Sequence, residues 1–254
     1  MENMPISEFD EDRSALIEPA IVYKNIGLPE CCVIPFYGSV IEKLKQDERL
    51  ELIHEFGSII MPTPVYKLTH NTNSLTVVCP TACGAPLAGA LLEELIAKGC
   101  RKFVACGSAG VLKTELSRGV IVIPTAAIRD EGTSYHYLPP SRTVTTEASV
   151  VDILEGVMQR HHVDYEVGMT WTTDAPYRET KKKIARRKEE GCLTVEMECS
   201  ALITVAKFRN VCFGQYLLAG DDVSGDEWDS RDFNAKSPAH EKIFWLSVEA
   251  CLEL

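Results

Sequence analysis

The chain has 254 residues, of which 45% are hydrophobic and 25% are charged, a composition that suits one globular domain with a sizeable core. Its formal net charge of −11 argues against a nucleic-acid scaffold or a polybasic membrane binder, because both need an excess of positive charge. No apolar run approaches the roughly 20 residues that cross a bilayer, and the acidic segment 1–12 lacks the basic and apolar regions of a signal peptide.

Short β-branched runs alternate with helical patterns, which is typical of an α/β fold. Residues 75–79 read as a buried strand, and turn residues follow at 80–85. A helix then begins near Pro86, a favourable first position, and ends at Gly99. The next strand is predicted at 102–106, followed by a loop at 107–110.

The remaining elements continue this alternation. Strands are predicted at 120–124, 166–171 and 211–219, and helices at 148–161, 178–189 and 197–208. The last helix is expected to begin at Ser237-Pro238, because serine caps a helix well and proline suits its first position. Two polar loops, 129–142 and 221–238, each follow a predicted strand. Ligands of α/β sheets bind where loops leave the carboxyl ends of strands, so both loops are candidate sites.

Ten cysteines are present, most of them in apolar runs and none in a CxxC pair. Buried free thiols in a reducing compartment explain this pattern best, so a cytoplasmic location is expected. The six histidines show no ligand spacing relative to the cysteines. No metal and no cofactor are therefore predicted.

Four features could carry chemistry, and each also has a purely structural interpretation. Glu196 and Glu198 flank Met197 at the start of an apolar helix, where they could bind ribose hydroxyls or simply favour the helix dipole. The run 107–110 (GSAG) could approach a ligand or form a tight turn. Asp221 and Asp222 could include a proton donor or lie in a solvated turn. An aromatic in 135–137 could stack on a base or anchor its loop.

Together these pieces resemble the nucleoside phosphorylase and uridine phosphorylase superfamily. The strongest match is 195–202 (VEMECSAL), which resembles the VEME-x-x-A-L stretch of the family. Three further segments match in order: 79–90, 129–137 (RDEGTSYHY) and 173–180 (TDAPYRET). The loop at 129–137 resembles the uridine phosphorylase-like branch. The resemblance begins at about Cys31, which leaves 1–30 as an N-terminal extension of one domain over 1–254.

The resemblance implies a three-layer α/β/α fold with a central mixed β-sheet, and a homohexamer or homodimer. It also implies cleavage of an N-glycosidic bond, with a small-molecule nucleoside and phosphate as partners and no nucleic acid or membrane. The expected roles fall on nine residues, of which Arg178 is a candidate for the base that no motif places. Glu198 would bind the ribose hydroxyls, with Met197 under the sugar and Glu196 assisting; Tyr137 and Arg178 would contact the base; Asp221 would protonate the leaving base; and Gly107, Ser108 and Gly110 would line the phosphate pocket.

The pocket for phosphate departs from the family pattern. Phe36 falls where the family has glycine, and Val40 and Ala105 fall where it has arginines. The arginine that a neighbouring subunit donates would fall near Met61. The lost cations could be replaced if Arg129, Arg142, Arg178 or Lys67 folds toward the phosphate site. The loop 35–40 also lacks the acidic residue that hydrolytic relatives use to activate water.

Three functions therefore remain open from the sequence. The first is phosphorolysis, which yields a base and ribose 1-phosphate. The second is a nucleosidase reaction in which water replaces phosphate. The third is non-catalytic nucleoside binding. The choice of base is open as well, because the loop around Tyr137 indicates the uridine branch, whereas Asp221 is a purine-type residue.

Overall fold

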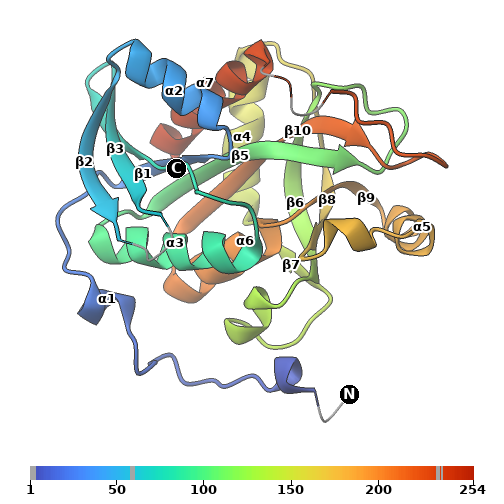
Figure 1. Ribbon diagram of the computed structural model, residues 1–254, viewed down its shortest axis with the longest axis horizontal. Coiled ribbons are helices and arrows are strands. Elements are labelled where there is room, and N and C mark those ends of the chain that lie inside the picture. Colours follow the sequence, from blue (N-terminus) through green and yellow to red (C-terminus); the bar gives the residue numbers. More distant parts are fainter. Residues whose placement is uncertain (1–3, 58–60, 233–234, 236) are drawn as a thin grey trace.

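A ten-stranded mixed sheet forms the centre of the computed structural model (Figure 1), which describes residues 4–57, 61–232, 235 and 237–254. The strand order is β10-β6-β8-β9-β5-β1-β4-β3-β2, with β7 beside β6. The strands are β1 Cys31–Pro35, β2 Leu50–Phe56, β3 Thr63–His70, β4 Asn73–Val77, β5 Lys102–Val111, β6 Ile121–Asp130, β7 Thr143–Thr145, β8 Tyr165–Thr173, β9 Cys192–Glu196 and β10 Cys212–Asp222.

One half of the sheet closes on itself. β10 pairs with β5 as well as with β6, so that β5, β10, β6, β8 and β9 form a ring of paired strands. The pairing is antiparallel between β5 and β9 and parallel between β5 and β10. Gly110 consequently lies opposite Val195, and the neighbouring Ala109 pairs with Ala219. The ends of β5, β9 and β10 therefore meet at one corner.

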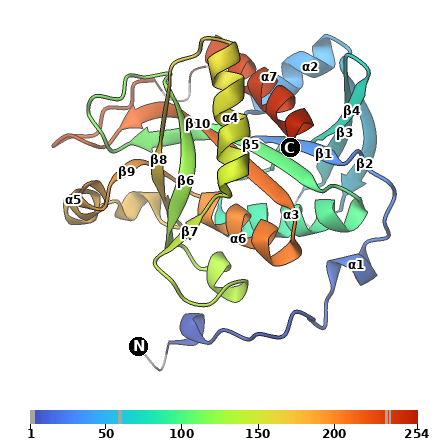
Figure 2. The same ribbon diagram turned by 180° about the vertical axis from the view of Figure 1, so that it is seen from behind.

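Helices cover both faces of the sheet, which confirms the predicted three-layer α/β/α fold with a central mixed sheet (Figures 1 and 2). On one face lie α2 Gly38–Gln46, α4 Ala148–Arg160 and α7 Pro238–Glu253. On the other lie α3 Ala85–Lys98 and α6 Cys199–Arg209. The outer elements are η1 Pro5–Ser7, α1 Pro19–Val22, η2 Thr133–His136, η3 Pro176–Arg178 and α5 Lys181–Glu189.

The predicted start of α7 at Ser237 and the predicted end of α3 at Gly99 are confirmed. Ser237 caps α7 by accepting a hydrogen bond from the main-chain N–H of Ala239 at 3.2 Å. Gly99 ends α3 with φ +127°, a conformation that favours glycine. The helix predicted from Arg178 instead begins at Lys181, because the Thr180 hydroxyl accepts from the Lys183 N–H and caps it there.

The loop predicted at 107–110 is wrong, because β5 continues without interruption to Val111. Pairing with β9 and β10 outweighs the poor strand propensity of the glycine, serine and alanine residues in this run. The ten cysteines are all free. Across the part of the chain that the structure describes, no helix is both long and apolar enough to span a membrane.

Candidate active site

Glu198 lies at the junction between β9 and α6, with its side chain almost fully buried. Its Oε1 accepts a hydrogen bond from the main-chain N–H of Gly84 at 2.6 Å. This contact ties the loop between β4 and α3 to the start of α6. Burial raises the pKa of Glu198, and the Gly84 N–H opposes that shift.

The side chain of Glu196 makes its recorded hydrogen bonds within the junction between β9 and α6. Its Oε2 accepts from the N–H groups of Glu198 and Cys199, both at 2.6 Å, and its Oε1 accepts from the Thr172 hydroxyl at 2.6 Å. Burial, and then the charge of Glu198, raises the pKa of Glu196 to about 8. The three recorded hydrogen bonds make Glu196 a cap of α6 that supports Glu198, and its expected contact with sugar or base stays a prediction.

Asp221 shares the corner where β5, β9 and β10 meet. A Cβ added to Gly110 would lie 3.0 Å from the Val195 side chain and 3.6 Å from Asp221 Oδ1. A side chain at position 110 would therefore force the Val195 side chain to shift. Asp221 Oδ2 accepts a hydrogen bond from the indole N–H of Trp228 at 2.7 Å. The structure thus brings Asp221 beside the end of β9 that leads into Glu198, and the half-buried Met197 directly precedes Glu198 in the chain.

Aromatic side chains lie beside Gly107 and Ser108, the residues expected to line a phosphate site. A Cβ at Gly107 would lie 3.3 Å from Cβ of Phe36, so Phe36 packs directly on this glycine. The hydroxyls of Tyr37 and Ser108 are 3.3 Å apart, within hydrogen-bond distance. Tyr37 also stacks on His240, with ring centroids 4.1 Å apart and planes 11° apart. Burial raises the pKa of Tyr37 well above its usual value, which keeps its hydroxyl protonated.

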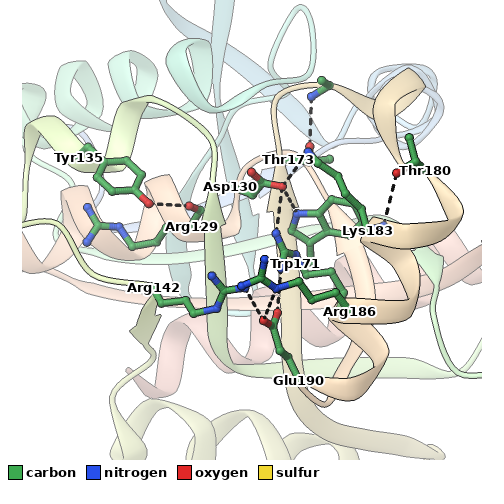
Figure 3. Close-up of polar contacts among 12 residues, drawn as sticks. Arg129, Asp130, Tyr135, Arg142, Trp171, Thr173, Thr180, Lys183, Arg186 and Glu190 are labelled. Carbon is green, nitrogen blue, oxygen red and sulfur yellow. Dashed lines mark hydrogen bonds and ion pairs between the residues drawn. The ribbon is translucent and has the colours of Figure 1, made fainter. Parts of the chain in front are cut away.

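The cations that could have replaced the missing arginines lie elsewhere. Arg129 is buried and donates to Ser134, Ser141 and the carbonyls of Leu138 and Pro139. Arg142 pairs with Glu190 (Figure 3), and Lys67 pairs with Glu51 at 3.6 Å. The side chain of Arg178 is exposed. None of these four, all within the described residues, contacts Ser108.

Tyr137 lies away from Glu198, at the opposite end of α6. Its ring packs edge-on against Phe208, with centroids 5.4 Å apart. Helix α6 has 11 residues, and at 1.5 Å per residue its ends are about 16 Å apart. Tyr137 lines a cavity of about 790 Å³ between the N-terminal extension, α3 and α6. The expected stacking of Tyr137 on a base stays a prediction, and within one chain Tyr137 and Glu198 lie at opposite ends of α6.

Several residues of the corner escaped the sequence analysis. Gly84, in the loop before α3, and Thr172, in strand β8, bind the two glutamates from positions far away in the chain. Trp228 donates to Asp221, and burial followed by the charge of Asp221 raises the pKa of Glu179, which falls in the segment 173–180 that resembles the family.

The fold and this corner define the class of protein: a three-layer α/β/α chain with a buried carboxylate at a strand–helix junction, beside a second carboxylate. The chain belongs to the Phosphorylase superfamily, whose pattern matches residues 31–250. It is 24% identical to the guanosine phosphorylase of Halorubrum lacusprofundi over 89% of this chain and 95% of that protein. The uridine phosphorylase of Vibrio fischeri has the same fold, with a TM-score of 0.76 and 19% identity over 96% of this chain and all of that one. The AMP nucleosidase of Bacteroides thetaiotaomicron gives a TM-score of 0.72 and 22% identity over 89% and 88% of the two chains.

Proposed function

We propose that this protein cleaves the N-glycosidic bond of a purine ribonucleoside and that water, rather than phosphate, accepts the ribosyl group. In this proposal Glu198 binds the ribose 2′- and 3′-hydroxyls, because a buried carboxylate can accept hydrogen bonds from both. Asp221 lies at the base. A carboxyl group there suits proton donation to a purine ring nitrogen.

One observation supports water as the acceptor: Phe36 packs on Gly107 in the pocket where phosphate would lie. A phosphate dianion needs charge-assisted hydrogen bonds, each worth about 1.5–3 kcal/mol. The side chains that could have supplied them, Arg129, Arg142 and Lys67, are paired elsewhere. Water needs no such cations. AMP nucleosidase shares this fold, and its name describes a hydrolytic reaction.

Phosphorolysis is the second candidate, since the similarity to guanosine phosphorylase covers 89% of this chain. A purine nucleoside panel in phosphate-free buffer made with ¹⁸O-water separates the two. We expect ¹⁸O at C1 of the released ribose and a rate that added phosphate does not raise. A requirement for phosphate, with ribose 1-phosphate as product, would overturn the proposal. If no nucleoside is cleaved but one raises the melting temperature, the protein binds without catalysis.

A further inference from the structure

Two hydroxyl groups meet where the proposed function places the acceptor. Ser108 is an exposed residue of β5, whereas Tyr37, just before α2, is buried. Their hydroxyl oxygens are 3.3 Å apart. Burial raises the pKa of Tyr37, so its hydroxyl stays protonated. Two neutral hydroxyls can orient a water molecule by donating and accepting hydrogen bonds. Activation of that water for attack needs a separate group that can take its proton.

An imidazole ring lies against the same tyrosine. His240, near the start of α7, stacks on the ring of Tyr37, with centroids 4.1 Å apart and planes 11° apart. Its Nδ1 atom is buried and has no hydrogen-bond partner among the residues that the structure describes. Buried polar atoms of proteins are normally paired with protein groups or with ordered water. A water molecule is therefore the expected partner of this nitrogen.

The charges around His240 favour its neutral form. Burial, and then the positive charge of Arg118 from the link between β5 and β6, lowers the pKa of His240. Glu241, the next residue of α7, forms an ion pair with Lys43 of α2, so its negative charge is compensated there. A neutral imidazole has one nitrogen with a lone pair, and that nitrogen can accept a proton. His240 therefore has the property that the two hydroxyls lack.

We infer that Tyr37 and Ser108 hold the attacking water and that His240 takes a proton from it. The inference rests on the proposed function and assigns the activating group, for which the loop 35–40 has no acidic residue. The water oxygen forms the new bond to C1′, and one water proton passes to the His240 ring nitrogen. The C1′–N bond breaks, and its electron pair passes to the base, which takes a proton from solvent on the Asp221 side. His240 then returns its proton to solvent, so atoms and charges balance.

His240→Ala, Tyr37→Phe and the control Glu241→Gln test this assignment in phosphate-free ¹⁸O-water. His240→Ala should lower kcat on a purine nucleoside by about 10²–10⁴-fold, the usual loss for a general base. Added imidazole should restore part of this activity and leave wild type unchanged, a response that a structural role of His240 would not give. Tyr37→Phe keeps the stacked ring and loses only the hydroxyl, so kcat should fall by about 10-fold. The control, on the same helix, should match wild type.

If His240→Ala is as active as Glu241→Gln while wild type transfers the ribosyl group to water, the inference is wrong and the proposed function stands. A crystal structure of wild type without substrate gives a reading that does not depend on activity. We expect an ordered water within hydrogen-bond distance of Ser108, Tyr37 and a ring nitrogen of His240. Ordered water at the hydroxyls that does not reach His240 would overturn the inference even where His240→Ala loses activity. A wild type that cleaves only with phosphate refutes the proposed function, and the inference with it.

Discussion

Glu198 and Glu196 are two residues apart, yet their side chains have different surroundings. Glu196 Oε2 alone accepts two N–H groups, whereas the recorded hydrogen bond of Glu198 goes to Gly84 across a loop. The sequence pattern alone cannot distinguish the two glutamates, because both are acidic and both precede the helix. The two side chains differ because the loop before α3 lies opposite Glu198, whereas strand β8 lies opposite Glu196. Both arrangements depend on tertiary structure.

Glu198→Gln tests the binding of ribose. Glutamine keeps one acceptor for the Gly84 N–H but loses the charge that strengthens bonds to hydroxyls. We expect kcat/KM on a purine nucleoside to fall about 100-fold, which corresponds to about 2.7 kcal/mol, while the melting temperature changes little. The control is Glu189→Gln, which is exposed. An unchanged kcat/KM would show that Glu198 does not contact the sugar.

At the scale of elements, helix ends were predictable and strand lengths were not. Ser237 and Gly99 act on neighbours within a few residues, so their signals are local and the structure confirms them. The second half of β5 consists of small residues that favour loops, and it is a strand only because β9 and β10 pair with it. The candidate site divides in the same way: the motif predicts Glu198, whereas its surroundings include Gly84 from the loop before α3 and Thr172 from strand β8, both distant in the chain.

Glu196→Gln tests the cap of α6. The carboxylate accepts from two N–H groups and one hydroxyl, and Thr172 Oγ1 already accepts from the Ser200 N–H. An amide cannot satisfy all of these contacts, so unfolding should become easier by about 1–3 kcal/mol. The free energies of unfolding in urea should be measured for Glu196→Gln and for Ser237→Ala. The second variant removes an ordinary helix cap and should cost about 1 kcal/mol. A smaller effect at Glu196 than at Ser237 would contradict the capping role.

At the scale of the whole molecule, the fold partly buries Glu179, in the η3–α5 link, where it feels the negative charge of Asp221 at the end of β10. Folding therefore half-buries a carboxyl beside a like charge. The pKa of Glu179 is raised from 4.5 to about 7 in the folded chain. Between these values the unfolded chain binds fewer protons, so this group lowers the free energy of unfolding as pH rises.

The melting temperature of Glu179→Gln should therefore gain on that of wild type as pH rises from about 5 to about 8, because only wild type must ionise this group. Comparing the two proteins at each pH cancels the titration of all other groups. Glu189→Gln should run parallel to wild type over the same range. A difference that stays constant with pH, or shrinks, would show that folding does not hinder ionisation of Glu179.

Phe36 on Gly107 also bears on the direction of the reaction. Phosphorolysis conserves the energy of the glycosidic bond in a sugar phosphate, so the same catalyst can run it backwards and rebuild a nucleoside. Transfer to water conserves nothing, and the large excess of water prevents return. With an aromatic ring in the acceptor pocket, the protein would serve breakdown only, and a cell would have to control when it meets its nucleoside.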